Sequence, residues 1–362
     1  MTVQPNPQQN RWYLLLGQAG PLIAAMPPAC FAMIMATGIV SIACHLLGFW
    51  FLAVPLFWLN LALYLILWLL TLARLACYPW QMFADLASHT RGVGFFTMIA
   101  GTCILGTQFY LLLEAYTPAA WLWLLGIFLW LLFIYGVLAA LIAKDDKPAL
   151  AAGINGTWLV ATVGTQSIAI LGALLASRVP VHRAEMLFLA LGMFLLGGML
   201  YLVIIVMISY RFLFCRLEPE GFDPTFWIST GAAAISTLAG ADILANGQGL
   251  PLIESIGPFL LGCTILFWAC ATWWIPLLAI LEIWRYLIRG VKISYTSDYW
   301  GLVFPLGMYT VCTVRLAEIS RLDFLWEISR YFVYLALTAW FLTFAGLVRS
   351  LLRSTTPGPG PV

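Results

Sequence analysis

Ten apolar stretches, each about as long as a membrane-spanning helix, alternate between two compositions along this chain. The odd-numbered stretches cover residues 31–47, 92–113, 156–176, 226–244 and 299–316, and the even-numbered ones cover residues 54–73, 119–143, 186–210, 258–281 and 326–348. Gly, Ser and Thr fill 27 of the 97 residues in the odd stretches but 14 of the 117 in the even ones, whereas ten Trp lie in the even stretches and three in the odd. Because small residues let helices approach closely, the alternation predicts an inner ring of odd helices wrapped by an outer ring of even helices.

The overall composition places this chain in a lipid bilayer. Hydrophobic residues make up 63% of it and charged residues 9%. We therefore expect an all-α integral membrane protein with ten transmembrane helices in a single domain, residues 1–362. Residues 1–30 are expected to form a cytoplasmic or interfacial lead-in, and the Pro/Gly-rich residues 354–362 a flexible tail.

Loop charges predict the orientation of the helices, because loops rich in Lys and Arg stay in the cytoplasm. The membrane side that holds both chain ends carries twelve Lys and Arg residues, and the opposite side carries five. An even number of spans also returns the chain to the side on which it starts. The sequence thus predicts a multi-pass protein of the inner (cytoplasmic) membrane with both termini in the cytoplasm.

Successive odd stretches begin at a nearly regular spacing. Their starts are separated by 61, 64, 70 and 73 residues, and each interval contains one odd stretch, a turn, one even stretch and a basic loop. Repetition of this kind is typical of a repeated structural unit. The spacing predicts five tandem helical hairpins around an axis along the membrane normal, with the odd helices lining a central pore.

Small and hydroxyl side chains in the odd stretches are the candidate lining of that pore. They are Thr37, Ser41, Thr97, Gly101, Thr162, Thr165, Ser236, Thr237 and Thr310. A second interpretation stays open, because small residues also serve helix packing and hydroxyls also bond to their own helix backbone. Ionisable side chains are almost absent from the middle of the stretches, so we expect a neutral lining and an apolar barrier.

The ninth stretch carries the candidate barrier, within residues 299–310 (YWGLVFPLGMYT). Pro305 removes a backbone donor and crowds the preceding turn, so a helix kink is expected there. Gly301 and Gly307 flank this position and complete a hinge that directs the Phe304 side chain inward. A bulky apolar side chain at a constriction gates by excluding water, and a rotamer change would open it.

Three ionisable residues near the ends of the stretches are further candidates. Arg315 follows Phe304 by eleven residues, which places both on nearly the same helix face, about 16 Å apart, so Arg315 could attract anions to the outer mouth. Alternatively, Arg315 pairs with Glu318 and ties down the external loop. His45 and Asp242 are candidates for proton sensitivity, although the plainer interpretation of His45 is an interfacial histidine.

Several other classes of protein are disfavoured by the sequence. The net charge of +2 gives no electrostatic basis for binding nucleic acid. The eight cysteines form no CxxC pair and the three histidines lack metal-ligand spacing, so we expect no metal site and no cofactor. The missing clusters of His, Cys and carboxylates also argue against an enzyme.

Three segments together resemble the tellurite-resistance/dicarboxylate transporter family: residues 31–41 (FAMIMATGIVS), 155–166 (NGTWLVATVGTQ) and 300–310 (WGLVFPLGMYT). That family includes bacterial tellurite-resistance channels, plant slow anion channels, and fungal malate and sulfite transporters. The resemblance extends over residues 31–348, in the same order of ten helices. It implies a homotrimer with one pore per protomer, small anions as cargo, and Phe304 as the gate.

The expected function is the passage of a small anion through a channel or transporter gated by an aromatic side chain. Candidate anions are a C4-dicarboxylate such as malate, sulfite, a halide and nitrate. The alternative is a secondary transporter that couples the export of dicarboxylate, sulfite or an oxyanion to protons, through His45 or Asp242. The expected partners are therefore the anion, the lipid bilayer and further copies of the chain.

Overall fold

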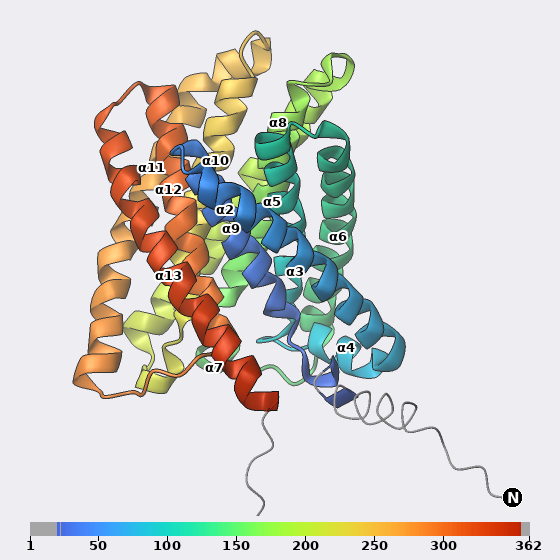
Figure 1. Cartoon of the computed structure of the whole chain (residues 1–362), viewed down its shortest axis with the longest axis vertical. Helices are drawn as coiled ribbons and strands as arrows, with labels where there is room; N and C mark the ends of the chain where they lie inside the picture. The colour runs from blue at the N-terminus through green and yellow to red at the C-terminus, as the bar shows by residue number, and fades with distance from the viewer. Residues whose placement is uncertain (1–19, 22, 356–362) are drawn as a thin grey trace, which may run out of the picture.

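The computed structural model describes residues 20, 21 and 23–355. Residues 1–19 and 22 of the predicted lead-in and residues 356–362 of the predicted tail lie outside the described residues. Within the described part the regular elements are all helical, and ten helices are long and apolar enough to cross a membrane (Figure 1). The prediction of an all-α protein with ten transmembrane helices is confirmed.

Five of these helices form an inner set, and each follows a short 3-10 turn. The inner helices are α2 (Ala32–Leu46), α5 (Phe96–Leu113), α8 (Val160–Ala176), α10 (Ile228–Asn246) and α12 (Trp300–Ser320). The turns before them are η1 (Pro28–Phe31), η2 (Gly92–Phe95), η3 (Gly156–Leu159), η6 (Pro224–Trp227) and η8 (Ser297–Tyr299). Asn155 and Asp223 cap two of these turns, because their side-chain oxygens accept hydrogen bonds from the amides of Thr157 (3.1 Å) and Thr225 (2.8 Å).

The outer helices are longer, at 28 to 33 residues. They are α3 (Trp50–Cys77), α6 (Tyr116–Ala143), α9 (Arg183–Phe214), α11 (Pro251–Ile283) and α13 (Phe324–Thr355). The connections contain α4 (Pro79–Leu86), α7 (Leu150–Gly153), η4 (Pro180–His182), η5 (Pro219–Gly221) and the π-helical turn η7 (Trp284–Ile288). Because about 20 residues suffice to cross the hydrocarbon, these helices have length to spare for tilting, and Figure 1 shows α13 running obliquely.

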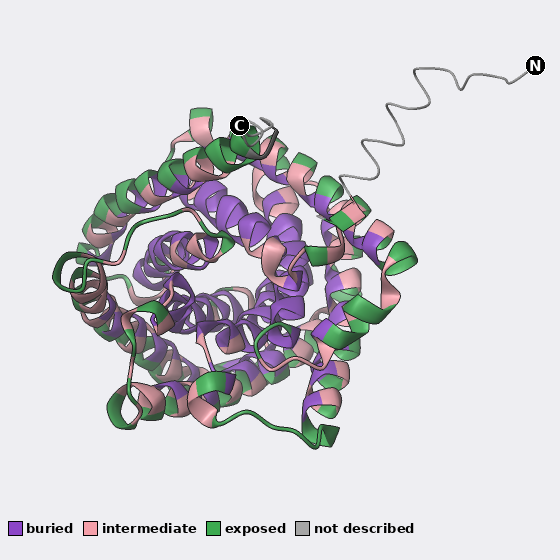
Figure 2. Cartoon of the chain, turned by 90° about the horizontal axis from the view of Figure 1, so that it is seen from below, coloured by how far each residue is buried: buried purple, intermediate pink, exposed green. Residues whose placement is uncertain are grey.

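Helix contacts arrange the chain in two concentric rings. Consecutive helices pack in pairs: α2 with α3, α5 with α6, α8 with α9, α10 with α11, and α12 with α13. The inner helices also pack on one another in the order α2, α5, α8, α10 and α12, and α12 returns to α2 (Figure 2). In the most apolar 18 residues of each span, 72–100% are buried in the inner helices and 28–44% in the outer ones. This arrangement is consistent with five hairpins and an inner and an outer ring.

Glycines set the spacing between neighbouring inner helices. A Cβ atom at Gly101 of α5 would lie 3.3 Å from the Cβ of Ile34 in α2. A Cβ at Gly164 of α8 would likewise lie 3.3 Å from the Cβ of Ile99 in α5. Helices come this close only where one side chain is very small, so these glycines allow the ring to close tightly.

The two described ends of the chain lie at the same end of the bundle, here called the proximal end, and the opposite end is called distal (Figure 1). Asp85 in α4 organises the proximal side. Its Oδ2 lies 2.6 Å from Nη2 of Arg74 and its Oδ1 lies 2.7 Å from Nε of Arg91. Arg74 also donates to the carbonyl of Ala24 at 3.1 Å. The two guanidinium groups thus neutralise a buried carboxylate and hold the start of the described chain against α3.

Candidate functional site

Two cavities open between the inner helices, one toward each end of the ring. Every inner helix contributes three residues to the wall of the distal cavity, at the spacing i, i+3, i+7. These residues are Ile39, Ile42 and Leu46 of α2, Ile104, Thr107 and Leu111 of α5, Ser167, Ile170 and Leu174 of α8, Ile235, Leu238 and Asp242 of α10, and Met308, Val311 and Arg315 of α12. The shared spacing keeps one face of each helix toward the cavity.

All five inner helices or their preceding turns again contribute to the wall of the proximal cavity. Its wall consists of Ala29, Ala32, Met35, Thr97, Thr157, Val160, Thr225, Ile228, Ser297, Asp298, Trp300, Gly301 and Phe304. These residues precede the distal set on the same helices. The two cavities therefore lie in line along the centre of the ring.

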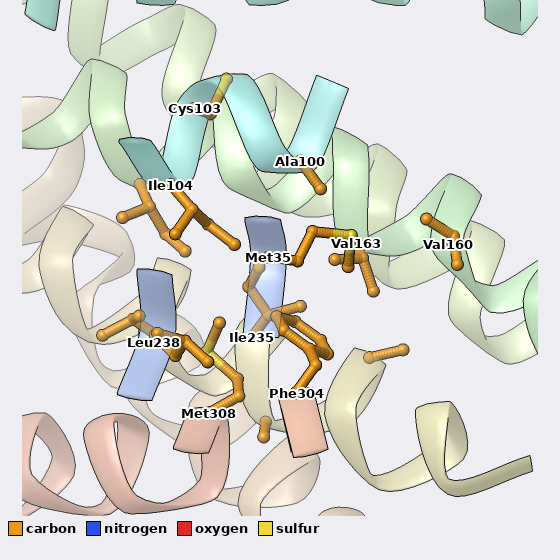
Figure 3. Packing of buried hydrophobic residues seen from close by; sticks show 14 of the residues in the cluster. Met35, Ala100, Cys103, Ile104, Val160, Val163, Ile235, Leu238, Phe304 and Met308 are labelled. Carbon is orange, nitrogen blue, oxygen red and sulfur yellow. The ribbon is translucent and has the colours of Figure 1, made fainter. Parts of the chain in front are cut away.

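One level of side chains lies between the two cavities. In each inner helix this level is formed by the residue four positions before the first one that lines the distal cavity. These residues are Met35, Ala100, Val163, Gly231 and Phe304. Figure 3 shows the side chains of Met35, Val163 and Phe304 pointing toward one another between the inner helices. Phe304 is 1% exposed and is the largest of the five side chains. This level separates the cavities with hydrocarbon.

The Phe304 ring lies directly against the backbone of α10. A Cβ atom at Gly231 would lie 3.0 Å from both Cδ1 and Cε1 of Phe304, and 2.9 Å from Cγ of Pro305. Contacts between carbon atoms are normally about 3.5–4.0 Å, so any side chain at Gly231 would displace the ring or the helix. The missing side chain at Gly231 is what gives Phe304 its position.

The predicted hinge residues have different surroundings. The α12 helix continues through Pro305 from its start to its end. Gly301 borders the proximal cavity, whereas Gly307 faces α2, because a Cβ there would lie 2.8 Å from Cγ2 of Ile39. Gly307 thus serves close packing of α12 on α2, and a hinge at these glycines stays a prediction.

Charged side chains enter the distal cavity from two helices. Arg315 of α12 and Asp242 of α10 both line its wall, and Nε of Arg315 lies 3.5 Å from Oδ1 of Asp242. Nη1 of Arg315 also donates to Oε2 of Glu318 at 2.7 Å. The predicted Arg315–Glu318 pair is therefore present, and Arg315 borders the cavity at the same time. Attraction of anions by Arg315 remains a prediction.

The nine predicted pore-lining residues differ in whether they border a cavity. Thr97 borders the proximal cavity. The remaining eight are buried but border neither cavity: Thr37, Ser41, Gly101, Thr162, Thr165, Ser236, Thr237 and Thr310. A pore-lining role for these eight stays a prediction.

Hydrogen bonds show what several of these hydroxyls do. The indole N–H of Trp340 in α13 donates to Oγ1 of Thr37 at 3.0 Å, and that of Trp130 in α6 donates to Oγ1 of Thr165 at 2.8 Å. Ser41 donates to a backbone carbonyl of α3 at 2.8 Å. These contacts join the inner ring to the outer ring, as the packing interpretation of the small residues expects.

The cavity-lining residues that sequence reasoning missed are mostly aliphatic. When each stretch is considered alone, these side chains resemble ordinary core residues. Examples are Ile39, Ile104, Ile170, Leu238 and Met308. A regularity nevertheless links the repeats, because the first cavity residue lies seven or eight positions after the start of each inner helix and the i, i+3, i+7 face recurs in all five. Aligning the five repeats with one another, rather than searching for polar residues, would have found this face.

His45 lies close to the distal end but does not border the distal cavity. Its ring contacts Trp50 edge-on, with 4.3 Å between the ring centroids. Its Nδ1 is buried without a hydrogen-bond partner within the described residues. A proton-sensitive role for His45 stays a prediction.

Comparison with known proteins agrees with this architecture. The profile of the voltage-dependent anion channel family (SLAC1) matches residues 25–348. An uncharacterized membrane protein of Mycobacterium tuberculosis is 33% identical over 152 residues, which are 42% of this chain and 77% of that protein. An uncharacterized transporter of Methanocaldococcus jannaschii is 23% identical over 320 residues, or 86% of this chain and 91% of the relative. A sulfite efflux pump of Trichophyton rubrum is 22% identical over 346 residues, or 89% and 90%.

The family match extends over nearly the whole chain, from just before the turn η1 to residue 348 within the last outer helix, α13. It confirms the resemblance to the tellurite-resistance/dicarboxylate transporters that the sequence segments indicated. Relatives of this chain include transporters and an efflux pump. This multi-pass membrane protein therefore belongs to the voltage-dependent anion channel family.

Proposed function

We propose that this protein conducts a small anion along the axis of the inner ring and that Phe304 gates the path. The observation that carries the proposal is the arrangement of two cavities in line, separated by one level of apolar side chains. All five inner helices contribute to both cavities. A path shared by five helices fits translocation through the ring better than binding at its surface.

The apolar level explains how such a path would stay closed. An anion must keep its hydration shell or replace it, and a hydrocarbon constriction provides no replacement. Phe304 is the largest side chain there and rests on Gly231, whose missing side chain leaves room for the ring. Rotation of this ring away from the axis would let water and an anion pass.

The cargo that we propose is a small anion such as sulfite, a C4-dicarboxylate, a halide or nitrate. The relative in Trichophyton rubrum, a sulfite efflux pump, supports sulfite as the first anion to examine. We further propose a homotrimer in the inner membrane with one path per protomer and both termini in the cytoplasm. The excess of basic residues on the side of the termini supports this orientation.

A proton-coupled transporter is the second candidate. Asp242 favours it, because this carboxyl is buried in the wall of the distal cavity and could exchange protons with the path. Coupling would make anion accumulation depend on a proton gradient. A channel would instead pass anions down their own gradient at any fixed pH.

Flux through purified protein in proteoliposomes tests the proposal, with sulfite, malate, nitrate and chloride as probes. We expect Phe304→Ala to raise anion flux at least tenfold over the wild type. Phe341→Ala is the matched control, because Phe341 lies on α13 and is 53% exposed on the outer surface. A proton-coupled transporter would instead lose gradient-driven accumulation in Phe304→Ala. Indifference of both proteins to all four anions would exclude the proposed conduit.

A further inference from the structure

The distal cavity has an uneven distribution of charge. Of the fifteen residues in its wall, Asp242 and Arg315 are charged and the others are neutral. The two charged residues occupy equivalent positions on neighbouring inner helices, each seven residues beyond the first cavity residue of its helix. At the same level the other three helices present Leu46, Leu111 and Leu174. An ion that crosses the distal mouth therefore passes this ion pair within a ring of leucines.

Arg315 is already engaged by two carboxylates. Its Nε faces Asp242 at 3.5 Å and its Nη1 binds Glu318 at 2.7 Å. The Asp242 side chain is 4% exposed, whereas that of Glu318 is 38% exposed, so solvent screens Glu318 more strongly. With all three groups ionised, the cluster carries one net negative charge. A passing anion therefore approaches a guanidinium whose positive charge is outweighed by the two neighbouring carboxylates.

We propose that Asp242 determines the charge selectivity of the distal mouth, by occupying Arg315 and so favouring singly charged anions over doubly charged ones. This inference rests on the proposed conduit. A dianion feels twice the repulsion of a monoanion from a net negative cluster. Asp242 also keeps Arg315 from holding an anion tightly, and fast passage requires sites that release the ion again.

The change Asp242→Asn preserves the shape of the side chain and removes its charge. We expect the sulfate-to-chloride flux ratio to rise about tenfold, roughly the effect of one unit charge acting over about 6 Å at an effective dielectric of about 40. Asp242→Glu keeps the charge and should restore the low ratio. Arg315→Gln should shift the ratio in the opposite direction, below that of the wild type, and provides a test if Asp242→Asn fails to fold.

Two controls separate a charge in the cavity from a charge on the surface. Glu327→Gln removes an exposed carboxylate, 58% exposed and paired with Arg330, at the distal start of α13. It should leave the flux ratio unchanged. Glu318→Gln should change the ratio less than Asp242→Asn does, because Glu318 is the more exposed partner of Arg315.

The measurement is chloride and sulfate flux in proteoliposomes at constant ionic strength and pH. An unchanged sulfate-to-chloride ratio in folded Asp242→Asn, or an equal rise in Glu327→Gln, would overturn the inference while the conduit itself remained supported. Absence of flux of sulfite, malate, nitrate and chloride in both the wild type and Phe304→Ala would instead exclude the conduit. The two failures are therefore distinguishable in one set of samples.

Discussion

Substitution of Gly231 by alanine is expected to open the proposed path, although it touches neither a charge nor a predicted hydroxyl. The added methyl group would lie 3.0 Å from two carbons of the Phe304 ring and 2.9 Å from Cγ of Pro305. The ring of Pro305 is tied to the backbone of α12 and cannot turn away. Either Phe304 must rotate or α10 and α12 must separate, and we expect both movements to widen the constriction.

The size of the effect follows from the overlap. Contacts of 2.9–3.0 Å must relax by about 0.5–1 Å to reach ordinary carbon–carbon separation. Overpacking of this kind costs about 1–3 kcal/mol in a well-packed interior. If the penalty applies to the closed state and is relieved when Phe304 turns away, the open fraction rises about 5- to 150-fold.

The assay is anion flux through proteoliposomes that contain equal amounts of folded protein. Gly257→Ala is the matched control, because Gly257 lies in α11 and a Cβ there would meet no atom within 4 Å. Adding Gly231→Ala to Phe304→Ala should raise flux less than Gly231→Ala does alone, since the methyl group then has no Phe304 ring to displace and meets only Cγ of Pro305. Residues in direct contact are expected to be non-additive in this way.

A folded Gly231→Ala protein with wild-type or lower flux would refute the reasoning. It would mean that the constriction absorbs the methyl group without moving Phe304, or that Phe304 does not limit passage. An equal increase in Gly257→Ala would also refute it. In that case the flux would reflect a general loosening of the bundle rather than the position of one ring.

Two further predictions concern the packing that holds the ring together. Gly156→Ala should abolish folding, because a Cβ there would clash with the backbone oxygen of Thr225. Loss of the monodisperse peak in size-exclusion chromatography measures this, and a well-folded variant would contradict it. Thr165→Val should destabilise the protein by about 1–3 kcal/mol, because it leaves the buried indole N–H of Trp130 unpaired. A lower thermal midpoint with an unchanged sulfate-to-chloride flux ratio is expected, and a changed ratio would assign Thr165 to the conduit after all.

Much of the fold could be predicted because bilayer physics leaves few alternatives. Every backbone group in hydrocarbon must be hydrogen-bonded, so long apolar stretches must be helices or a closed barrel. The contrast in composition then separated inner from outer helices. Helix lengths were harder to predict: α9 begins at Arg183 and ends at Phe214, beyond both ends of the predicted stretch 186–210. Length and tilt depend on packing against neighbours, which composition does not encode.

The candidate site was predictable where the neighbours of a residue mark it. Phe304 stands directly before Pro305 and between Gly301 and Gly307, and it lies at the level between the cavities. The contact between Phe304 and Gly231 could not be predicted, because it depends on the rotation of α10 relative to α12. For the same reason the pairing of Asp242 with Arg315, 73 residues apart in the chain, required the structure.

The same geometry gives the alternating composition a physical cause. Inner threonines and outer tryptophans are hydrogen-bond partners, in the pairs Thr37–Trp340, Thr165–Trp130 and Thr313–Trp268. A buried indole N–H needs an acceptor, and a threonine hydroxyl can accept it while donating to its own helix backbone. The polar face of these inner helices is therefore used at the interface between the rings, which leaves a mostly aliphatic face toward the distal cavity. An anion in that cavity would find few donors besides Thr107, Ser167 and Arg315, so we expect selectivity there to depend on the charged pair Asp242 and Arg315.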